Sequence, residues 1–296
     1  MLEPKAPIFH RQWFIGAYRQ SQDIIVAEAH YVDSFLEMTA RLEAGVKDLV
    51  ARKVTLATHR DSSRVPPRFD PANLAEGLAW ISRDVSQSLD CLQGMVCYTG
   101  VGKLVRKAVA PDPLGLKEDL ILEAIRAVIQ AETFIFIERG FKDAFDYEAY
   151  FNRTFAGSCR YYSNLDRVSR NFSQGLLVHS RGPNLFSRFR STAVYRCQDK
   201  YQVVAQLSDS FHEMELNLLL NPNHLVVEEA HAFMLRFPDP VCQESEELVK
   251  AGLPGVGLRP ENKKHIYAAC GGGNGCTHLG DMAFDVARAL KILGSW

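Results

Sequence analysis

The stretch Asp33-Ser34-Phe35-Leu36-Glu37-Met38 returns, with one change, as Asp209-Ser210-Phe211-His212-Glu213-Met214. The likeness continues without a gap, so that residues 33–66 align with residues 209–242. Self-similarity over such a length is the sequence signature of a repeated structural unit. The sequence therefore predicts a tandem duplication of one unit.

Hydrophobic spacing suggests what each copy contains. Alternation of apolar and polar residues predicts two strands in each copy, over Val26–Glu43 and Leu49–Thr58 and over Gln202–Leu220 and Leu225–Leu235. Helical spacing predicts the remaining elements, Leu74–Leu89 and Val101–Val109 in the first copy and Glu244–Lys250 and Leu279–Leu290 in the second. Each copy is thus expected to be an antiparallel hairpin followed by helices, which is an α+β fold.

The region between the two copies has a different character. Pro111-Asp112-Pro113 marks a boundary, and a strongly apolar helix is predicted over Glu118–Glu138. The stretch Phe141–Tyr162, which follows, is rich in Phe and Tyr, and these residues favour a contact between domains or subunits over a ligand pocket. We therefore expect a first repeat at 1–112, a helical, aromatic-rich connector at 113–168 and a second repeat at 169–296. The connector could bind a protein partner or a second copy of the chain.

Composition narrows the class of protein. The 296 residues are 47% hydrophobic and 23% charged, as in soluble globular proteins. A net charge of -1 argues against nucleic-acid binding, which usually needs a basic excess. No apolar run approaches the roughly 18 residues that span a bilayer, and the N-terminus lacks the order of a signal peptide, so a cytoplasmic protein is expected. Seven cysteines, an odd number, favour packing, metal binding or catalysis over a disulfide framework.

The two copies differ at residues that can bind metals. The second copy has His212 where the first has Leu36, and Cys242 where the first has Pro66. Two residues with ligand atoms are therefore replaced by residues without them. This pattern predicts one functional site, in the second repeat, and a degenerate first repeat.

The end of the second repeat adds two further candidates. Cys276 and His278 precede its last helix, whereas the corresponding part of the first repeat keeps only Cys97. Thiolate and imidazole ligands suit zinc, iron or an iron–sulfur cluster, and three or four of them complete a tetrahedral site. The predicted ligands are His212, Cys242, Cys276 and His278.

The run Gly271-Gly272-Gly273-Asn274-Gly275 precedes these residues. Its backbone N–H groups could hold an anion at the start of the last helix. Alternatively, the run is a loop that lets Cys276 approach a metal. It matches neither the phosphate-binding P-loop nor the dinucleotide-binding pattern, and we favour the loop.

The second repeat resembles a bacterial family of unknown function. The resemblance rests on His179-Ser180-Arg181, His212-Glu213-Met214, Cys242 and the closing motif Gly275-Cys276-Thr277-His278-Leu279. The family is largely uncharacterised and typically has a single copy of the domain. The resemblance extends to the first repeat only in the framework that the two repeats share.

A more distant resemblance, to NifU-type iron–sulfur scaffold proteins (NifU/IscU-like), implies more chemistry. In that family three cysteines and an aspartate converge on a labile cluster or a zinc ion. The aspartate position falls on His212, the second cysteine on Cys242 and the third on Cys276. The first cysteine falls on Ser210, which puts cluster assembly and transfer in doubt, and His278 or His212 would have to complete the ligand set.

Three functions remain open from the sequence. The first is binding of a metal or an iron–sulfur cluster, as in an accessory or maturation factor. The second is a cysteine-dependent enzyme in which Cys276 is the nucleophile, because a helix N-terminus lowers a thiol pKa and His212 or His278 could be the base. The third is a structural subunit of a larger complex.

Overall fold

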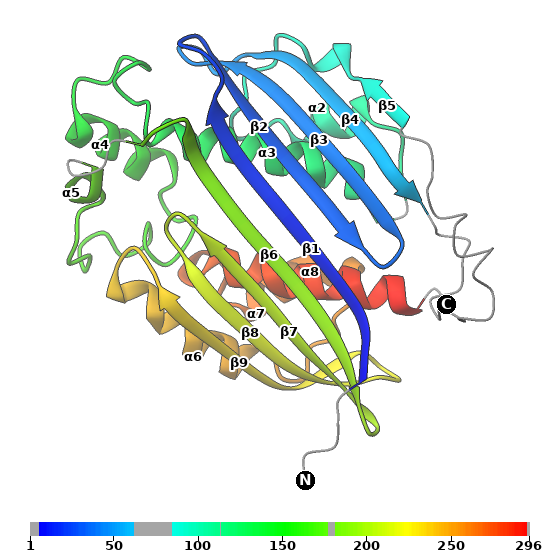
Figure 1. Cartoon of the computed structure of the whole chain (residues 1–296). Helices are drawn as coiled ribbons and strands as arrows, with labels where there is room; N and C mark the ends of the chain where they lie inside the picture. The colour runs from blue at the N-terminus through cyan, green and yellow to red at the C-terminus, as the bar shows by residue number, and fades with distance from the viewer. Residues whose placement is uncertain (1–5, 62–84, 113, 177–180, 295–296) are drawn as a thin grey trace. The chain divides into compact units, whose positions relative to one another are not determined.

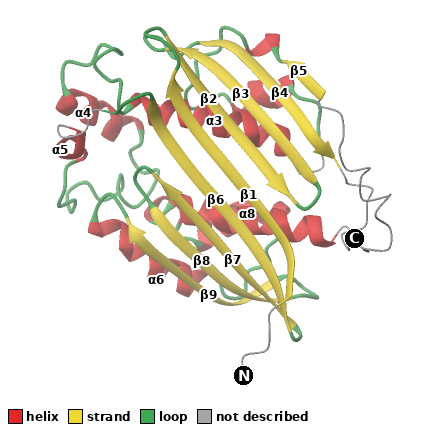
Figure 2. Ribbon diagram, viewed as in Figure 1, coloured by secondary structure: helices red, strands yellow, loops and turns green. Residues whose placement is uncertain are grey.

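The strands of the chain belong to one sheet. In the computed structural model, which describes residues 6–61, 85–112, 114–176 and 181–294, nine strands form a sheet in the order β5-β4-β3-β2-β1-β6-β7-β8-β9 (Figure 1, Figure 2). The expected fold, two NifU-like α+β units in tandem joined by a helical connector, is therefore wrong. The hairpins that the sequence assigns to separate repeats contribute their strands to a single antiparallel sheet.

The strands have the bounds β1 Ala6–Arg19, β2 Ile24–Asp33, β3 Leu36–Gly45, β4 Ala51–Asp61, β5 Val85–Ser88, β6 Asn184–Cys197, β7 Lys200–Asp209, β8 Glu213–Asn221 and β9 Val226–Arg236. The helices are α2 Gly102–Ala108, α3 Leu116–Glu132, α4 Ala144–Thr154, α5 Phe172–Leu176, α6 Ser245–Gly252, α7 Lys263–Ala269 and α8 Thr277–Gly294. None of the helices within the described ranges is long and apolar enough to cross a membrane.

The chain divides into two compact units. Unit 1 comprises Met1–Arg11, Ala144–Val178 and Phe189–Trp296, and unit 2 comprises Gln12–Asp143 and His179–Arg188. The three predicted ranges 1–112, 113–168 and 169–296 follow the sequence similarity rather than these contacts, and they stay a prediction.

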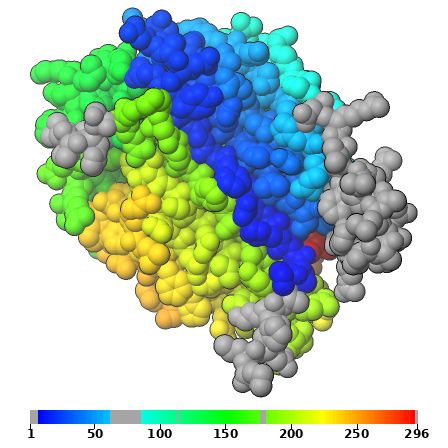
Figure 3. Space-filling view, in the orientation of Figure 1, coloured from blue at the N-terminus to red at the C-terminus, as the bar shows by residue number. Residues whose placement is uncertain are grey.

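Unit 2 is organised around strands β2 to β5 and helix α3. Alternate residues of β2 are buried, among them Ala27, Ala29 and Tyr31, because successive side chains of a strand point to opposite faces. Helix α3 packs against β2 and β3. Its buried side includes Leu120 and Val128. The opposite face of these strands lies at the surface of the space-filling view (Figure 3).

Unit 1 has a comparable core of strands and helices. Helix α8 packs against β7 and β8, and α6 packs against β9. Alternate residues of β7, β8 and β9 are buried, which gives these strands one apolar face. A buried ion pair joins α8 to the start of the chain, because Arg11 contacts Asp285 at 2.6 Å, and Thr192 donates a hydrogen bond to the same carboxylate. The core of unit 1 therefore contains a neutralised charge as well as apolar contacts.

Two strands predicted from alternation are in fact hairpins. Val26–Glu43 contains most of β2 and most of β3, and Gln202–Leu220 contains most of β7 and of β8. Val32 pairs with Glu37, and Ser208 pairs with Glu213. These turns contain no Gly or Pro, so the usual turn signal is missing. The only trace of each turn is a change of phase, because burial moves from odd-numbered residues, such as Leu207, to even-numbered ones, such as Met214.

Other predicted elements are confirmed. Strand β9 matches the prediction for Leu225–Leu235, and helices α2, α3, α6 and α8 match four predicted helices within a few residues, except that α3 ends at Glu132 rather than Glu138. The helix expected over Leu74–Leu89 lies mostly outside the described residues, and its last part is wrong because residues 85–88 form β5. Pro66, His179 and Ser180 also lie outside the described residues.

Candidate metal centre

The turn between β7 and β8 begins with a buried aspartate. The Asp209 side chain is 0% exposed. Its Oδ1 atom accepts hydrogen bonds from the backbone N–H groups of Phe211, at 2.8 Å, and of His212, at 2.7 Å. Aspartate often stabilises turns in this way, because its side chain replaces a backbone acceptor. Asp209 therefore sets the backbone conformation from which the His212 side chain extends.

The same carboxylate also contacts the His212 ring. Nδ1 of His212 lies 3.1 Å from Oδ1 of Asp209, and the His212 side chain is 14% exposed. A carboxylate is an acceptor, so this contact favours the tautomer in which Nδ1 carries the proton. Nε2 then keeps its lone pair, which is the arrangement of metal-binding histidines whose second nitrogen is held by a carboxylate. The turn thus leaves Nε2 of His212 available to bind a metal.

His278 lies on the first turn of α8, next to His212. The two ring centroids are 4.2 Å apart and the rings are tilted by 42°. Asp209, His212 and His278 each offer one ligand atom, and these three atoms all lie within 4.8 Å of one another. Two imidazoles and a carboxylate are a ligand set that suits zinc and non-haem iron. The structure therefore brings together two of the four predicted ligands, with an aspartate that was not predicted.

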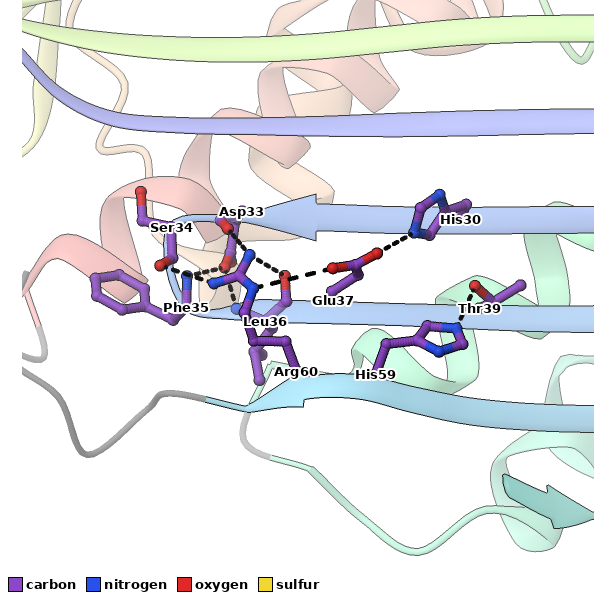
Figure 4. A network of polar contacts seen from close by, with 9 residues as sticks. All are labelled: His30, Asp33, Ser34, Phe35, Leu36, Glu37, Thr39, His59 and Arg60. Atoms are coloured by element: carbon purple, nitrogen blue, oxygen red, sulfur yellow. Dashed lines mark hydrogen bonds and ion pairs between the residues drawn. The ribbon is translucent and has the colours of Figure 1, made fainter. Parts of the chain in front are cut away.

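A turn of the same design in unit 2 forms without a histidine. Between β2 and β3, Oδ1 of Asp33 accepts from the N–H groups of Phe35, at 2.7 Å, and of Leu36, at 2.6 Å (Figure 4). Arg60 donates to backbone carbonyls of this turn, as Arg236 does to those of the β7–β8 turn. Leucine therefore occupies the position of His212 in an otherwise similar turn.

The polar network around that turn contains two further histidines but differs from the site in unit 1. His30 contacts Glu37 at 3.2 Å, and His59 contacts Thr39 at 2.9 Å (Figure 4). The His30 and His59 rings are 6.2 Å apart. These side chains lie along the strands, rather than beside Asp33 in the turn, so the metal-ligand geometry of Asp209, His212 and His278 is not reproduced there.

The two predicted cysteine ligands lie in buried positions. Cys276 directly precedes α8, and its sulfur accepts hydrogen bonds from the N–H groups of His278 and Leu279. Burial nevertheless raises the pKa of the Cys276 thiol to about 12. Cys242 lies in a short 3-10 helix, Pro240–Glu244, and burial raises its pKa to about 11. Among the described residues, neither thiol belongs to the group of ligand atoms that Asp209, His212 and His278 form.

The glycine run forms a loop that contacts the segment 158–163. Ser163 donates its hydroxyl to the Gly273 carbonyl at 2.7 Å, and the backbone N–H of Arg160 donates to the Gly275 carbonyl at 2.8 Å. A Cβ atom on Gly273 would lie 2.5 Å from the Gly157 carbonyl oxygen. The glycines are thus needed for close approach of two backbones, which favours the loop interpretation over an anion site.

Two residues of interest were missed by sequence reasoning. Asp209 occurs in both similar stretches, as Asp33 does in the first, so the comparison of the copies assigns it to their common framework. The spacing of three residues between Asp209 and His212 could have identified it, because a turn brings such residues together. The other is Cys159, whose neighbour Arg160 contacts Val241 and Gly275, the residues directly before Cys242 and Cys276. It lies in the aromatic stretch, and its spacing gives no signal.

Comparison with known proteins finds a similarity for one part of the chain. Residues 184–291 match the family described as "Protein of unknown function (DUF2889)". This range includes Asp209, His212, Cys242, Cys276 and His278. The expectation of a family of unknown function is confirmed for this part of the chain, whereas no similarity to NifU-type proteins is found. No curated protein and no solved structure matches the chain.

Proposed function

We propose that the protein binds a divalent transition-metal ion, zinc or iron, at Asp209, His212 and His278. The observation that carries this proposal is the convergence of their three ligand atoms within 4.8 Å. Ligands that bind zinc at about 2.0–2.2 Å stand roughly 3.3 Å apart, so small side-chain rotations are enough to enclose an ion. Imidazoles and a carboxylate suit a single ion better than an iron–sulfur cluster, whose usual ligands are thiolates.

The three residues have different roles in this proposal. His212 and His278 bind the ion through ring nitrogens. Asp209 holds Nδ1 of His212 at 3.1 Å and places a negative charge beside the ion. Two direct protein ligands are fewer than the four of structural zinc sites, so coordination positions are left for water or a substrate. The role of an accessory or maturation factor, and a partner at the aromatic stretch, stay predictions.

The cysteine-enzyme alternative is less well supported by the geometry. A nucleophilic cysteine needs a thiolate, and thiols of low pKa occur in partly exposed, electropositive surroundings. Cys276 is buried, with a pKa raised to about 12, so its thiol stays protonated near neutral pH. The hydrogen bonds from the start of α8 do not offset the effect of burial.

A titration of metal-free protein with cobalt(II) tests the proposal. We expect one ion per chain at this site, identified by the visible absorption of cobalt bound to nitrogen and oxygen ligands and displaced by zinc. The variants His212→Leu and His278→Gln should lose the absorption, whereas His231→Gln, a change at an exposed histidine of the same unit, should retain it. Binding that is unchanged in His212→Leu and His278→Gln would contradict the proposal.

A further inference from the structure

Two segments of unit 1 are joined by hydrogen bonds on either side of a pair of cysteines. The backbone N–H of Arg160 donates to the Gly275 carbonyl at 2.8 Å, and the Thr277 hydroxyl donates to the Ser158 carbonyl at 2.8 Å. Residue 160 is thus opposite residue 275, and residue 158 is opposite residue 277. The residues between these contacts are Cys159 and Cys276.

A third cysteine is brought to the same place by Arg160. Its Nε atom donates to the Val241 carbonyl at 3.1 Å, and its guanidinium forms an ion pair with Glu244. Another nitrogen of the guanidinium donates to the Asn274 carbonyl at 3.0 Å. Val241 precedes Cys242 directly. Arg160 therefore connects the loop that carries Cys242 to the loop that carries Cys276, with Cys159 as its own neighbour.

The electrostatic effects agree with this arrangement. Burial is the largest cause of the raised pKa of Cys242, and the charge of Cys159 raises it further. Burial likewise dominates for Cys276, and both Cys159 and Cys242 add to it. Cys270, another buried thiol of unit 1, has a pKa raised by burial alone. The charges of Cys159, Cys242 and Cys276 thus act on one another, whereas Cys270 is outside this group.

We propose that Cys159, Cys242 and Cys276 form a second cation site, which takes a thiophilic ion such as zinc, cadmium or copper(I). Each thiol that binds the ion releases one proton, and the positive charge of Arg160 offsets part of the negative charge of the thiolates. Among the described residues the three sulfurs do not form a group within 4.8 Å of one another, so the proposed site requires these side chains to rotate toward the ion. The site shares no proposed ligand with the histidine centre, and either can fail without the other.

Cadmium is the probe for the test, because thiolate–cadmium bonds give a strong ultraviolet charge-transfer band. Reduced, metal-free full-length protein is titrated with cadmium, and the variants Cys159→Ser, Cys242→Ser and Cys276→Ser are compared with Cys270→Ser as the matched buried control. We expect each of the first three variants to weaken cadmium binding by about tenfold or more and to lower the band. Cys270→Ser and His212→Leu should leave the band unchanged.

Several results would overturn the proposal. These are the absence of a thiolate band in the parent protein, a full band in Cys159→Ser, or an equal loss in Cys270→Ser. Thermal unfolding of each variant is measured in parallel, and Cys159→Ser decides the outcome because its side chain is only partly buried and the change is least disruptive. A cadmium band that persists when cobalt binding at His212 is lost supports the thiol site independently of the histidine centre.

Discussion

Replacement of His212 by leucine separates metal binding from folding. The variant loses the contact between His212 and Asp209, and a hydrogen bond to a charged group contributes about 1.5–3 kcal/mol. Leucine offsets part of this loss because it covers apolar surface, and Leu36 occupies the corresponding place in the β2–β3 turn. The free energy of unfolding of the metal-free protein should therefore change by less than about 2 kcal/mol.

The effect on the metal-bound protein should be larger and predictable. At a free metal concentration 100 times the Kd, binding stabilises the folded state by about 2.7 kcal/mol. The loss of one direct ligand weakens binding by about 100-fold or more, and the same metal concentration then stabilises the variant by only about 0.4 kcal/mol. For a chain of this size the zinc-dependent rise in Tm should fall from about 5 °C to about 1 °C.

Thermal unfolding with and without zinc provides the assay. The parent protein, His212→Leu and the exposed control His231→Gln are compared at the same zinc concentration after removal of bound metal. An equal zinc-dependent rise in Tm for the parent protein and His212→Leu would refute the assignment of His212 as a ligand. A metal-free His212→Leu that is unfolded would refute the comparison with the Leu36 turn.

Three further predictions follow from the geometry. Asp209→Asn keeps an oxygen acceptor for the turn but removes the negative charge beside His212. Zinc affinity measured by calorimetry should therefore fall about 10–100-fold, while the Tm of the metal-free protein changes little. An unchanged zinc affinity would exclude the role of Asp209 in orienting His212. Asp285→Asn should lower the free energy of unfolding in urea by about 3 kcal/mol, because it leaves the buried Arg11 without its counter-charge, and a loss below about 1 kcal/mol would show that the pair is dispensable. The free energy of unfolding should fall as the pH rises above 9, since buried thiols keep their protons up to about pH 11–12 in the folded chain but lose them near pH 9 in the unfolded chain. The thiols concerned are Cys97, Cys242, Cys270 and Cys276. Each of these thiols lowers the free energy of unfolding by about 1.4 kcal/mol per pH unit in that window, so replacement of one of them by Ala should make the decline with pH less steep by that amount.

The sequence predicted individual elements better than it predicted the fold. Alternation and helical spacing located β9 and helices α3, α6 and α8, because each has one buried face with its own period. The hairpins were hidden, since the turns at Ser34-Phe35 and Ser210-Phe211 depend on a preceding aspartate side chain rather than on Gly or Pro. Which strands lie side by side depends on contacts distant in sequence, and two similar hairpins could not show that all strands form one sheet.

The candidate site was predicted only in part, because it also depends on contacts between residues distant in sequence. His212 and His278 were identified because they differ from the equivalent first stretch, and the structure places their rings 4.2 Å apart. Asp209 was assigned to the shared framework, although a residue can stabilise a turn and orient a ligand at once. Cys159 lies 83 residues before Cys242 in the chain, and only the contacts of Arg160 show that the two are neighbours.

The most direct test of the histidine centre is an anomalous difference map from crystals of the protein soaked with zinc and measured at the zinc absorption edge. We predict a peak between the ring nitrogens of His212 and His278, about 2.0–2.1 Å from each. A zinc-loaded crystal with no peak at these two rings, or with its zinc bound only at other residues, would contradict the account.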